Sequence, residues 1–206
     1  MLAILRQNPG DDRAVPSSRE DALAGGALPD FETLLRLYHK RVFSLIYRLI
    51  GNPDEVADLT QETFVRAFRA YPRFRGSPTA VYPWLCRIAV NGCKNRFREI
   101  GRREKYEWRS LDDPVESGDD RLTLEMGDAT GDPLRAVEQH ELEGKIQEAI
   151  QALPPEYRTV LVLRDMQGLS YQEIADAAEL SLEVVKVRLF RARGVLRRRL
   201  APYLAA

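Results

Sequence analysis

The residues best placed for chemistry lie near the C-terminus, in the stretch SYQEIADAAELSLEVVKVRLFRAR that starts at Ser170. Ser170 and Glu173 have the spacing of a capping box at the start of a short helix. Ser181 is placed to cap a second helix, which we expect to reach about Leu200. Two helices joined by about three residues form a helix-turn-helix, whose second helix enters the major groove of DNA. The stretch therefore predicts a DNA-binding element.

The second predicted helix has two different faces. One face is apolar and is expected to be buried: Val185, Leu189, Ala192 and Leu196. The opposite face mixes cations with apolar residues: Lys186, Val187, Phe190, Arg191 and Arg198. Apolar contact with thymine methyl groups and arginine contact with guanine or phosphate would explain this mixture. The alternative, in which Phe190 packs against another helix, remains open here.

The distribution of charge supports contact with a polyanion. The chain has 31 basic and 31 acidic residues, but they are segregated. Residues 66–105 contain eleven Lys or Arg and two acids, and residues 183–199 contain seven and one. Residues 107–143 contain twelve acids and three arginines. Two basic blocks on either side of an acidic block indicate two polyanion-binding surfaces and a connection between them.

The elements that must carry these surfaces are helices. From Phe31, apolar residues recur every three or four positions up to Gly51, which is expected to end the first helix. The next helix has Asn52 as its N-cap, with Glu55 placed to close a capping box, and is expected to run to about Tyr71. Further helices are expected over residues 80–99 and again from about Leu142.

Residues 108–136 show no periodicity, and a run of this length is typical of a linker. We therefore predict an all-α chain of two small helical domains, joined by an acidic flexible linker. The predicted parts are a disordered tail (1–28), an N-terminal domain (29–105), the acidic linker (106–140) and a helix-turn-helix domain (141–206).

The chain resembles the extracytoplasmic-function (ECF) sigma factors of bacteria. The stretch LPPEYRTVLVLRDMQGLSYQEIADAAELSLEVVKVRLFRAR is similar to domain four of that family. The stretches NPDEVADLTQETFVRAFRAYPRFRG and YPWLCRIAVNGCKNRFR resemble its domain two. The resemblance covers about residues 31–100 and 142–200. It implies a factor that binds core RNA polymerase, recognises the minus-thirty-five and minus-ten promoter elements and helps to melt DNA.

The resemblance also implies three sets of contact residues. Binding to the β′ coiled coil of the polymerase falls on an exposed helix face: Asp58, Gln61 and Glu62. Recognition of the opened minus-ten element, by stacking and phosphate contact, falls on Phe74, Arg75, Tyr82, Asn91, Lys94 and Asn95. Recognition of the minus-thirty-five element falls on Lys186, Val187, Phe190 and Arg191, with Arg188 and Arg193 as phosphate contacts. For the first set, a merely solvated polar face is the alternative.

The chain departs from the family pattern in its turn and in its recognition helix. Glu179 occupies a turn position where glycine is usual, at a backbone cost of order 1 kcal/mol if its φ is positive. Val187 stands where a small polar residue is common, which leaves the preferred minus-thirty-five sequence open. The family further implies contact with the β flap of the polymerase and an inhibitory anti-sigma factor, which is often membrane-bound.

The acidic linker has three possible roles. Its charge would be attracted to a basic channel that later holds RNA. It could equally be a solubilising connection. It could also mask the basic surfaces of the free protein, which is a salt-sensitive effect.

Two other classes of protein share parts of this sequence pattern. A one-site transcription regulator would have the helix-turn-helix but would not bind core polymerase. A metal-dependent nuclease needs carboxylates fixed around metal ions, whereas the available acids lie in the segment without periodicity: Asp112, Asp113, Asp119, Asp120 and Glu125. We therefore expect no enzyme activity.

The cysteines and the termini indicate a cytoplasmic protein without cofactor or metal. Cys86 and Cys93 would be about 10 Å apart along a helix, too far for a disulfide, and with His39 and His140 they lack zinc-ligand spacing. We expect Cys86 in the core, and for Cys93 a redox role stays open. No secretory signal or membrane-spanning run is evident.

Overall fold

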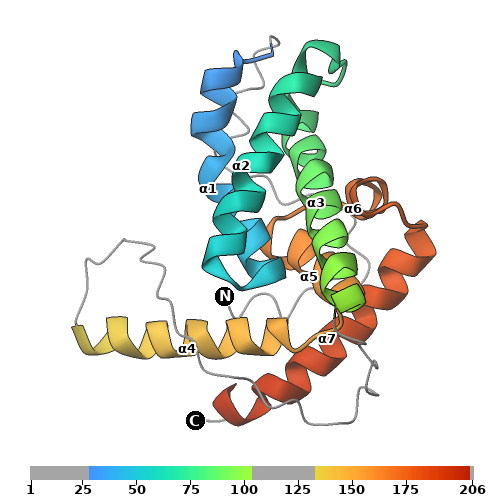
Figure 1. The fold of residues 1–206 in the computed structure, drawn as a ribbon. Coiled ribbons are helices and arrows are strands. Elements are labelled where there is room, and N and C mark those ends of the chain that lie inside the picture. Colours follow the sequence, from blue (N-terminus) through green and yellow to red (C-terminus); the bar gives the residue numbers. More distant parts are fainter. Residues whose placement is uncertain (1–27, 104–132, 205–206) are drawn as a thin grey trace.

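The structure is a computed structural model that describes residues 28–103 and 133–204. Within these ranges every regular element is a helix (Figure 1), which confirms the all-α fold class. The elements are α1 (Phe31–Ile50), α2 (Pro53–Ala70), η3 (Tyr71–Arg73), η4 (Pro78–Ala80), α3 (Val81–Arg103), α4 (Pro133–Gln151), α5 (Pro155–Leu161), the π-helical η5 (Val162–Met166), α6 (Tyr171–Ala178) and α7 (Leu182–Leu204). Most of the predicted tail and linker, with the carboxylates considered for a nuclease, lies outside the described residues.

Helix α1 is delimited by its own sequence. The side chain of Asp30 accepts a hydrogen bond of 2.6 Å from the backbone N–H of Thr33. Gly51 ends the helix as predicted, with φ at 88°, a conformation that favours a residue without Cβ. The inward face is buried along its whole length: Leu34, Tyr38, Val42, Leu45, Ile46 and Leu49.

Helix α2 begins as predicted, but Glu55 in its first turn makes a different contact from the predicted one. The side chain of Asn52 accepts hydrogen bonds from two backbone N–H groups of the first turn. The predicted capping box is wrong, because the Glu55 carboxylate accepts two hydrogen bonds of 2.8 Å from Arg96 on α3 instead. The pair joins the start of α2 to α3, and both helices pack against α1.

The C-terminal half contains the helix-turn-helix, formed by α6 and α7. Helix α4 begins at Pro133, earlier than the position near Leu142 at which the apolar pattern becomes regular. Ser170 and Glu173 form the predicted capping box at the start of α6. Glu179 follows α6 in the left-handed region, at φ 58°, so the predicted backbone cost of order 1 kcal/mol applies.

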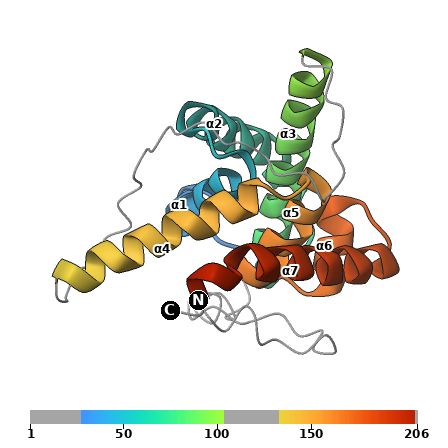
Figure 2. The same cartoon turned by 90° about the horizontal axis from the view of Figure 1, so that it is seen from below.

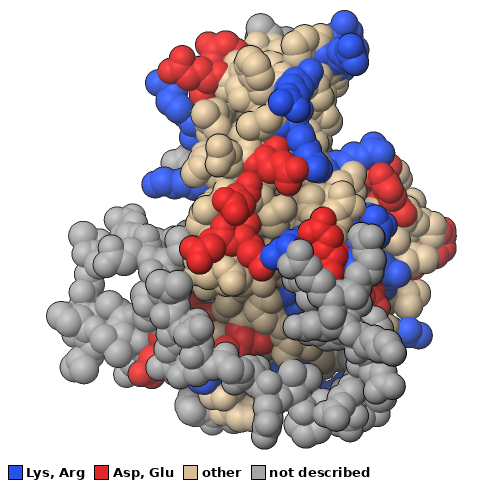
Figure 3. Space-filling view, viewed as in Figure 1, with Lys and Arg blue, Asp and Glu red and all other residues tan. Residues whose placement is uncertain are grey.

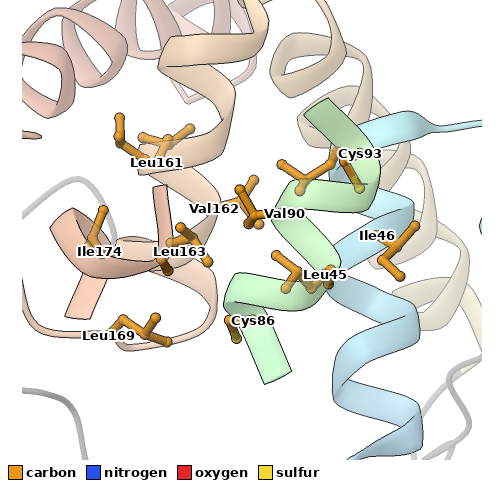
Figure 4. Close-up of a cluster of buried hydrophobic side chains, with 14 of the residues drawn as sticks. Leu45, Ile46, Cys86, Val90, Cys93, Leu161, Val162, Leu163, Leu169 and Ile174 are labelled. Atoms are coloured by element: carbon orange, nitrogen blue, oxygen red, sulfur yellow. The ribbon is translucent and has the colours of Figure 1, made fainter. Parts of the chain in front are cut away.

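The two halves share one hydrophobic core. Helices α4 and α7 lie across the end of the α1–α3 bundle (Figure 2), and α6 packs against α3. Figure 4 shows Leu45 of α1 and Val90 of α3 facing Val162 and Leu163 of the C-terminal half. The two small helical domains are thus present and packed against each other.

Candidate nucleic-acid interface

Helix α7 has the two faces that its sequence predicts. At its start, the Ser181 hydroxyl accepts a hydrogen bond of 3.4 Å from a backbone N–H. The four residues of the apolar face are buried: Val185, Leu189, Ala192 and Leu196. On the other face Val187 is 49% exposed and Phe190 78% exposed, beside exposed Lys186 and Arg191. This exposure overturns the alternative in which Phe190 packs against another of the described helices.

An open groove of about 360 Å³ lies between α5 and the first half of α7. Its walls are formed by Glu156, Tyr157, Glu183, Val184, Val187, Arg188 and Arg191. A nitrogen of the Arg191 guanidinium donates a hydrogen bond to the Tyr157 hydroxyl at 3.5 Å, which holds this cation at the groove. Glu156 and Glu183 of this groove were not among the predicted contact residues.

Helix α2 carries the polar face expected to contact polymerase. Asp58, Gln61 and Glu62 are all exposed, so the prediction that they share an exposed face is confirmed. The Glu62 carboxylate accepts a hydrogen bond of 2.6 Å from Arg66, one turn later. The opposite side of α2 is buried against α1 and α3 by Val56, Thr60, Thr63, Phe64 and Ala67.

The loop before α3 holds an aromatic cluster beside cations. The Phe74 ring lies 5.0 Å from Trp84 and 6.2 Å from Tyr71 between ring centres, and all three are half-buried. Arg75 is exposed and donates to a backbone carbonyl of its own loop at 2.9 Å. Figure 3 shows Lys and Arg atoms gathered at the end of the molecule where α2 and α3 are joined.

Comparisons with known proteins match each half of the chain to a family description. The family description Sigma-70 region 2 matches residues 34–103, and Sigma-70, region 4 matches residues 143–196. The RNA polymerase sigma-H factor of Pseudomonas aeruginosa is 36% identical over 84% of this chain and 88% of its own length. The ECF RNA polymerase sigma factor SigE of Mycolicibacterium smegmatis is 34% identical over 98% of this chain and 76% of its own length.

The chain belongs to the ECF sigma factors. It is a promoter-recognising sigma factor of RNA polymerase, with region 2 in α1–α3 and region 4 in α4–α7. Two solved structures share its fold. The sigma factor RpoE of Bartonella quintana, solved with the anti-sigma factor NepR, has a TM-score of 0.60 and 20% identity, over 84% of this chain and 97% of that one. CnrH, solved with the cytosolic domain of CnrY, has a TM-score of 0.54 and 23% identity, over 84% and 88%.

Tyr82 of this sigma factor is not on the surface expected to contact the minus-ten element. It is 1% exposed, and its hydroxyl donates to Oε1 of Gln167 in region 4 at 2.5 Å. Its ring stacks on Tyr38, and the Arg41 guanidinium lies 3.5 Å from the ring centre. Burial raises the pKa of Tyr82 well above its usual range, so the hydroxyl stays neutral and acts as a donor. In this arrangement Tyr82 cannot stack on a base, which contradicts the expectation.

Lys94, on the same side of α3, is also covered by region 4. Its Nζ donates to the backbone carbonyl of Ala178, the last residue of α6, at 2.5 Å. Burial lowers the pKa of the Lys94 ammonium. Asn95 is exposed and Asn91 is half-buried. Lys94 is itself half-buried, but its ammonium is bound to α6, whereas neither asparagine has such a contact with the described residues of α6.

Arg193, predicted to contact phosphate, is bound to a carboxylate within the protein instead. Its Nε donates to one Asp165 carboxylate oxygen at 2.9 Å, and a second nitrogen donates to the other. The two side chains are 13% and 1% exposed, and the pairing raises the pKa of Arg193. The guanidinium therefore joins α7 to η5. Arg188 lines the groove and remains available as a phosphate contact.

Neither Cys86 nor Cys93 forms a disulfide, and both are buried in the core. Burial raises the pKa of Cys93 to about 12, so little reactive thiolate forms at neutral pH, which argues against a redox role. In the part of the chain that the structure describes, no three His, Cys, Asp or Glu residues are grouped to hold a metal ion. No described helix is long and apolar enough to cross a membrane.

Contacts between regions 2 and 4 were missed by the sequence analysis. Arg158, 8% exposed, donates to the backbone carbonyl of Leu49 at 2.5 Å. Gln151 donates through Nε2 to the backbone carbonyl of Arg48 at 2.9 Å. Both satisfy carbonyls that the end of α1 leaves without helical partners. These partners are 109 and 103 residues apart, and local periodicity carries no signal at that distance.

Proposed function

We propose that this sigma factor makes its contacts through three exposed faces on three helices. Helix α2 binds the β′ coiled coil of core polymerase through Asp58, Gln61 and Glu62. The loop before α3 and the accessible part of α3 open and recognise the minus-ten element through Phe74, Arg75, Asn91 and Asn95. Helix α7 recognises the minus-thirty-five element through Lys186, Val187, Phe190 and Arg191, with Arg188 on the phosphates.

The observation that carries the proposal is the α7 face that combines exposed Phe190 and Val187 with Lys186 and Arg191. Apolar side chains on a cationic helix fit a major groove better than they fit water. The proposal includes no catalytic step and places the protein in the cytoplasm. It also includes binding of the β flap by region 4 and inhibition by an anti-sigma factor. The fold relative RpoE, solved with the anti-sigma factor NepR, supports the latter.

Contact of the opened DNA strand along the covered face of α3 requires a rearrangement. Region 4 covers the α3 face that carries Tyr82 and Lys94, through Gln167 and the end of α6. A separated DNA strand that follows α3 along this face needs the same space as α6. We therefore expect α3 and α6 to separate when the sigma factor binds polymerase and promoter.

The decisive experiment is transcription with purified core RNA polymerase. We expect the full chain to direct specific initiation, and the double variant Asp58→Lys/Glu62→Lys to lose core binding and run-off transcript together. The matched control, Glu32→Lys/Glu148→Lys, makes the same change in charge at exposed positions on α1 and α4. Wild-type core binding by the first variant, or loss of binding by both, would refute the assignment to α2. Failure of the unmodified chain to initiate would refute the proposed function.

A further inference from the structure

A carboxylate lies at the N-terminal end of the α7 face that is proposed to meet DNA. Helical spacing puts Glu183, Val187, Phe190 and Gly194 on one side of α7, opposite the buried residues. Glu183 is exposed and lies in the first turn. Residues near the N-terminus of a recognition helix contact base edges directly. Glu183 therefore occupies a position for recognition of a base and not only for solubility.

The immediate surroundings of Glu183 are apolar on one side. The groove between α5 and α7 has Glu183 next to Val184, which is 37% exposed, and Val187, which is 49% exposed. A methyl-bearing base edge would fit this apolar part of the groove. Glu183 would then contact the edge of the neighbouring base in the major groove of the DNA.

Glu183 is ionised, and the nearest cation that acts on it is Lys186, one turn along α7. Hydrogen bonds from its own backbone N–H and from Ser181 lower its pKa. Among the residues that the structure describes, Glu183 takes part in no ion pair. An exposed carboxylate without an ion-pair partner repels phosphate and so weakens binding to DNA in general. It favours binding only where DNA offers a hydrogen-bond donor.

The major groove offers such a donor at cytosine, whose N4 amino group is the usual partner of glutamate. We propose that Glu183 determines specificity by accepting a hydrogen bond from the N4 amino group of a cytosine in the minus-thirty-five element. An adjacent thymine contacts Val187 through its methyl group. The inference rests on the proposed entry of α7 into the major groove. Beyond that entry, it specifies which base the Glu183 carboxylate recognises.

The test uses the full-length chain and a duplex DNA library randomised over the minus-thirty-five region. We expect the enriched sequences to share a cytosine beside a thymine. Replacing that cytosine should lower affinity about 5- to 150-fold, as measured by fluorescence anisotropy. Replacing the thymine by uracil, which removes only the methyl group, should lower affinity about fourfold.

The variants assign each effect to a side chain. Glu183→Ala should abolish the cytosine preference and strengthen binding to unrelated duplexes, because a negative charge is lost. Glu183→Gln should shift the preference towards adenine, the usual partner of glutamine. Val187→Ala should reduce the uracil penalty and leave the cytosine preference intact. The control Glu148→Ala removes an exposed carboxylate from α4 and should change neither preference.

Failure of the Glu183 proposal and failure of the proposed DNA binding by α7 give different results. Retention of the cytosine preference by Glu183→Ala, or an enriched sequence without a fixed cytosine, would overturn the role of Glu183 and leave the DNA-binding role of α7 intact. If the unmodified chain enriches no sequence at all, recognition of the minus-thirty-five element by α7 is itself refuted.

Discussion

In the closed arrangement of the sigma factor, α6 of region 4 packs against α3 of region 2. The hydrogen bond between Tyr82 and Gln167 allows the stability of this arrangement to be tested. The Tyr82 hydroxyl donates to Oε1 of Gln167 at 2.5 Å, and the two residues belong to different regions. The substitution Gln167→Ala removes the acceptor and leaves the buried hydroxyl in place. We expect it to favour separation of α3 from α6.

The expected size follows from the surroundings of the hydroxyl. Loss of one partner of a buried polar group costs about 1–3 kcal/mol. Cys86 and Arg41 remain near the hydroxyl as polar neighbours, so the loss should fall at the lower end. About 1 kcal/mol corresponds to about a fivefold rise in the ratio of open to closed molecules.

A native thiol reports this opening. Cys86 lies one turn after Tyr82 on α3, is 0% exposed and is shielded from solvent in the closed arrangement. When opening is faster than labelling, the labelling rate follows the open population. Gln167→Ala should therefore raise the rate at Cys86 about fivefold, as measured by mass spectrometry after timed alkylation.

The control for this prediction is Gln172→Ala. Gln172 is an exposed residue of α6 whose amide donates a hydrogen bond to Asp176 on the same helix, at 3.1 Å. Its substitution should leave labelling at Cys86 unchanged. Equal labelling rates for both variants would refute the idea that the Tyr82 contact holds the two regions together.

Three further predictions concern stability. Hydrogen bonds from Arg96 lower the pKa of Glu55 below 4.5, so its contribution is present above that pH and is lost as the pH falls through the lowered value. Glu55→Gln should lower the free energy of unfolding by about 1 kcal/mol at pH 7 and should reduce its decrease at acid pH, as measured by urea unfolding. An unchanged decrease at acid pH would contradict this. Glu179→Gly should relieve the left-handed conformation and add about 1 kcal/mol to the free energy of unfolding, whereas a lower melting temperature would count against backbone strain. A Cβ at Gly194 or Gly144 would meet no atom within 4 Å, so alanine at either should stabilise its helix by about 1 kcal/mol. Only Gly194→Ala should weaken minus-thirty-five binding, and equal DNA affinity of the two variants would argue against close approach of DNA at that face.

The local elements of this sigma factor were determined by its sequence. Asn52, Ser170 and Gly51 act at helix ends through neighbours within four positions, so their types and spacing suffice to predict these ends. The same holds for the two faces of α7, because burial repeats with the period of the helix. Exposure of Val187 and Phe190 could be predicted in this way.

The tertiary structure alone decided which polar side chains remain accessible. Tyr82 and Arg193 have residue types suited to DNA, yet each is held by a partner 85 or 28 residues away, Gln167 or Asp165. Periodicity shows where a helix is apolar, but side chains at the edge of that face are covered or exposed by whichever helix packs next to them. That choice depends on contacts between distant segments, which no local pattern encodes.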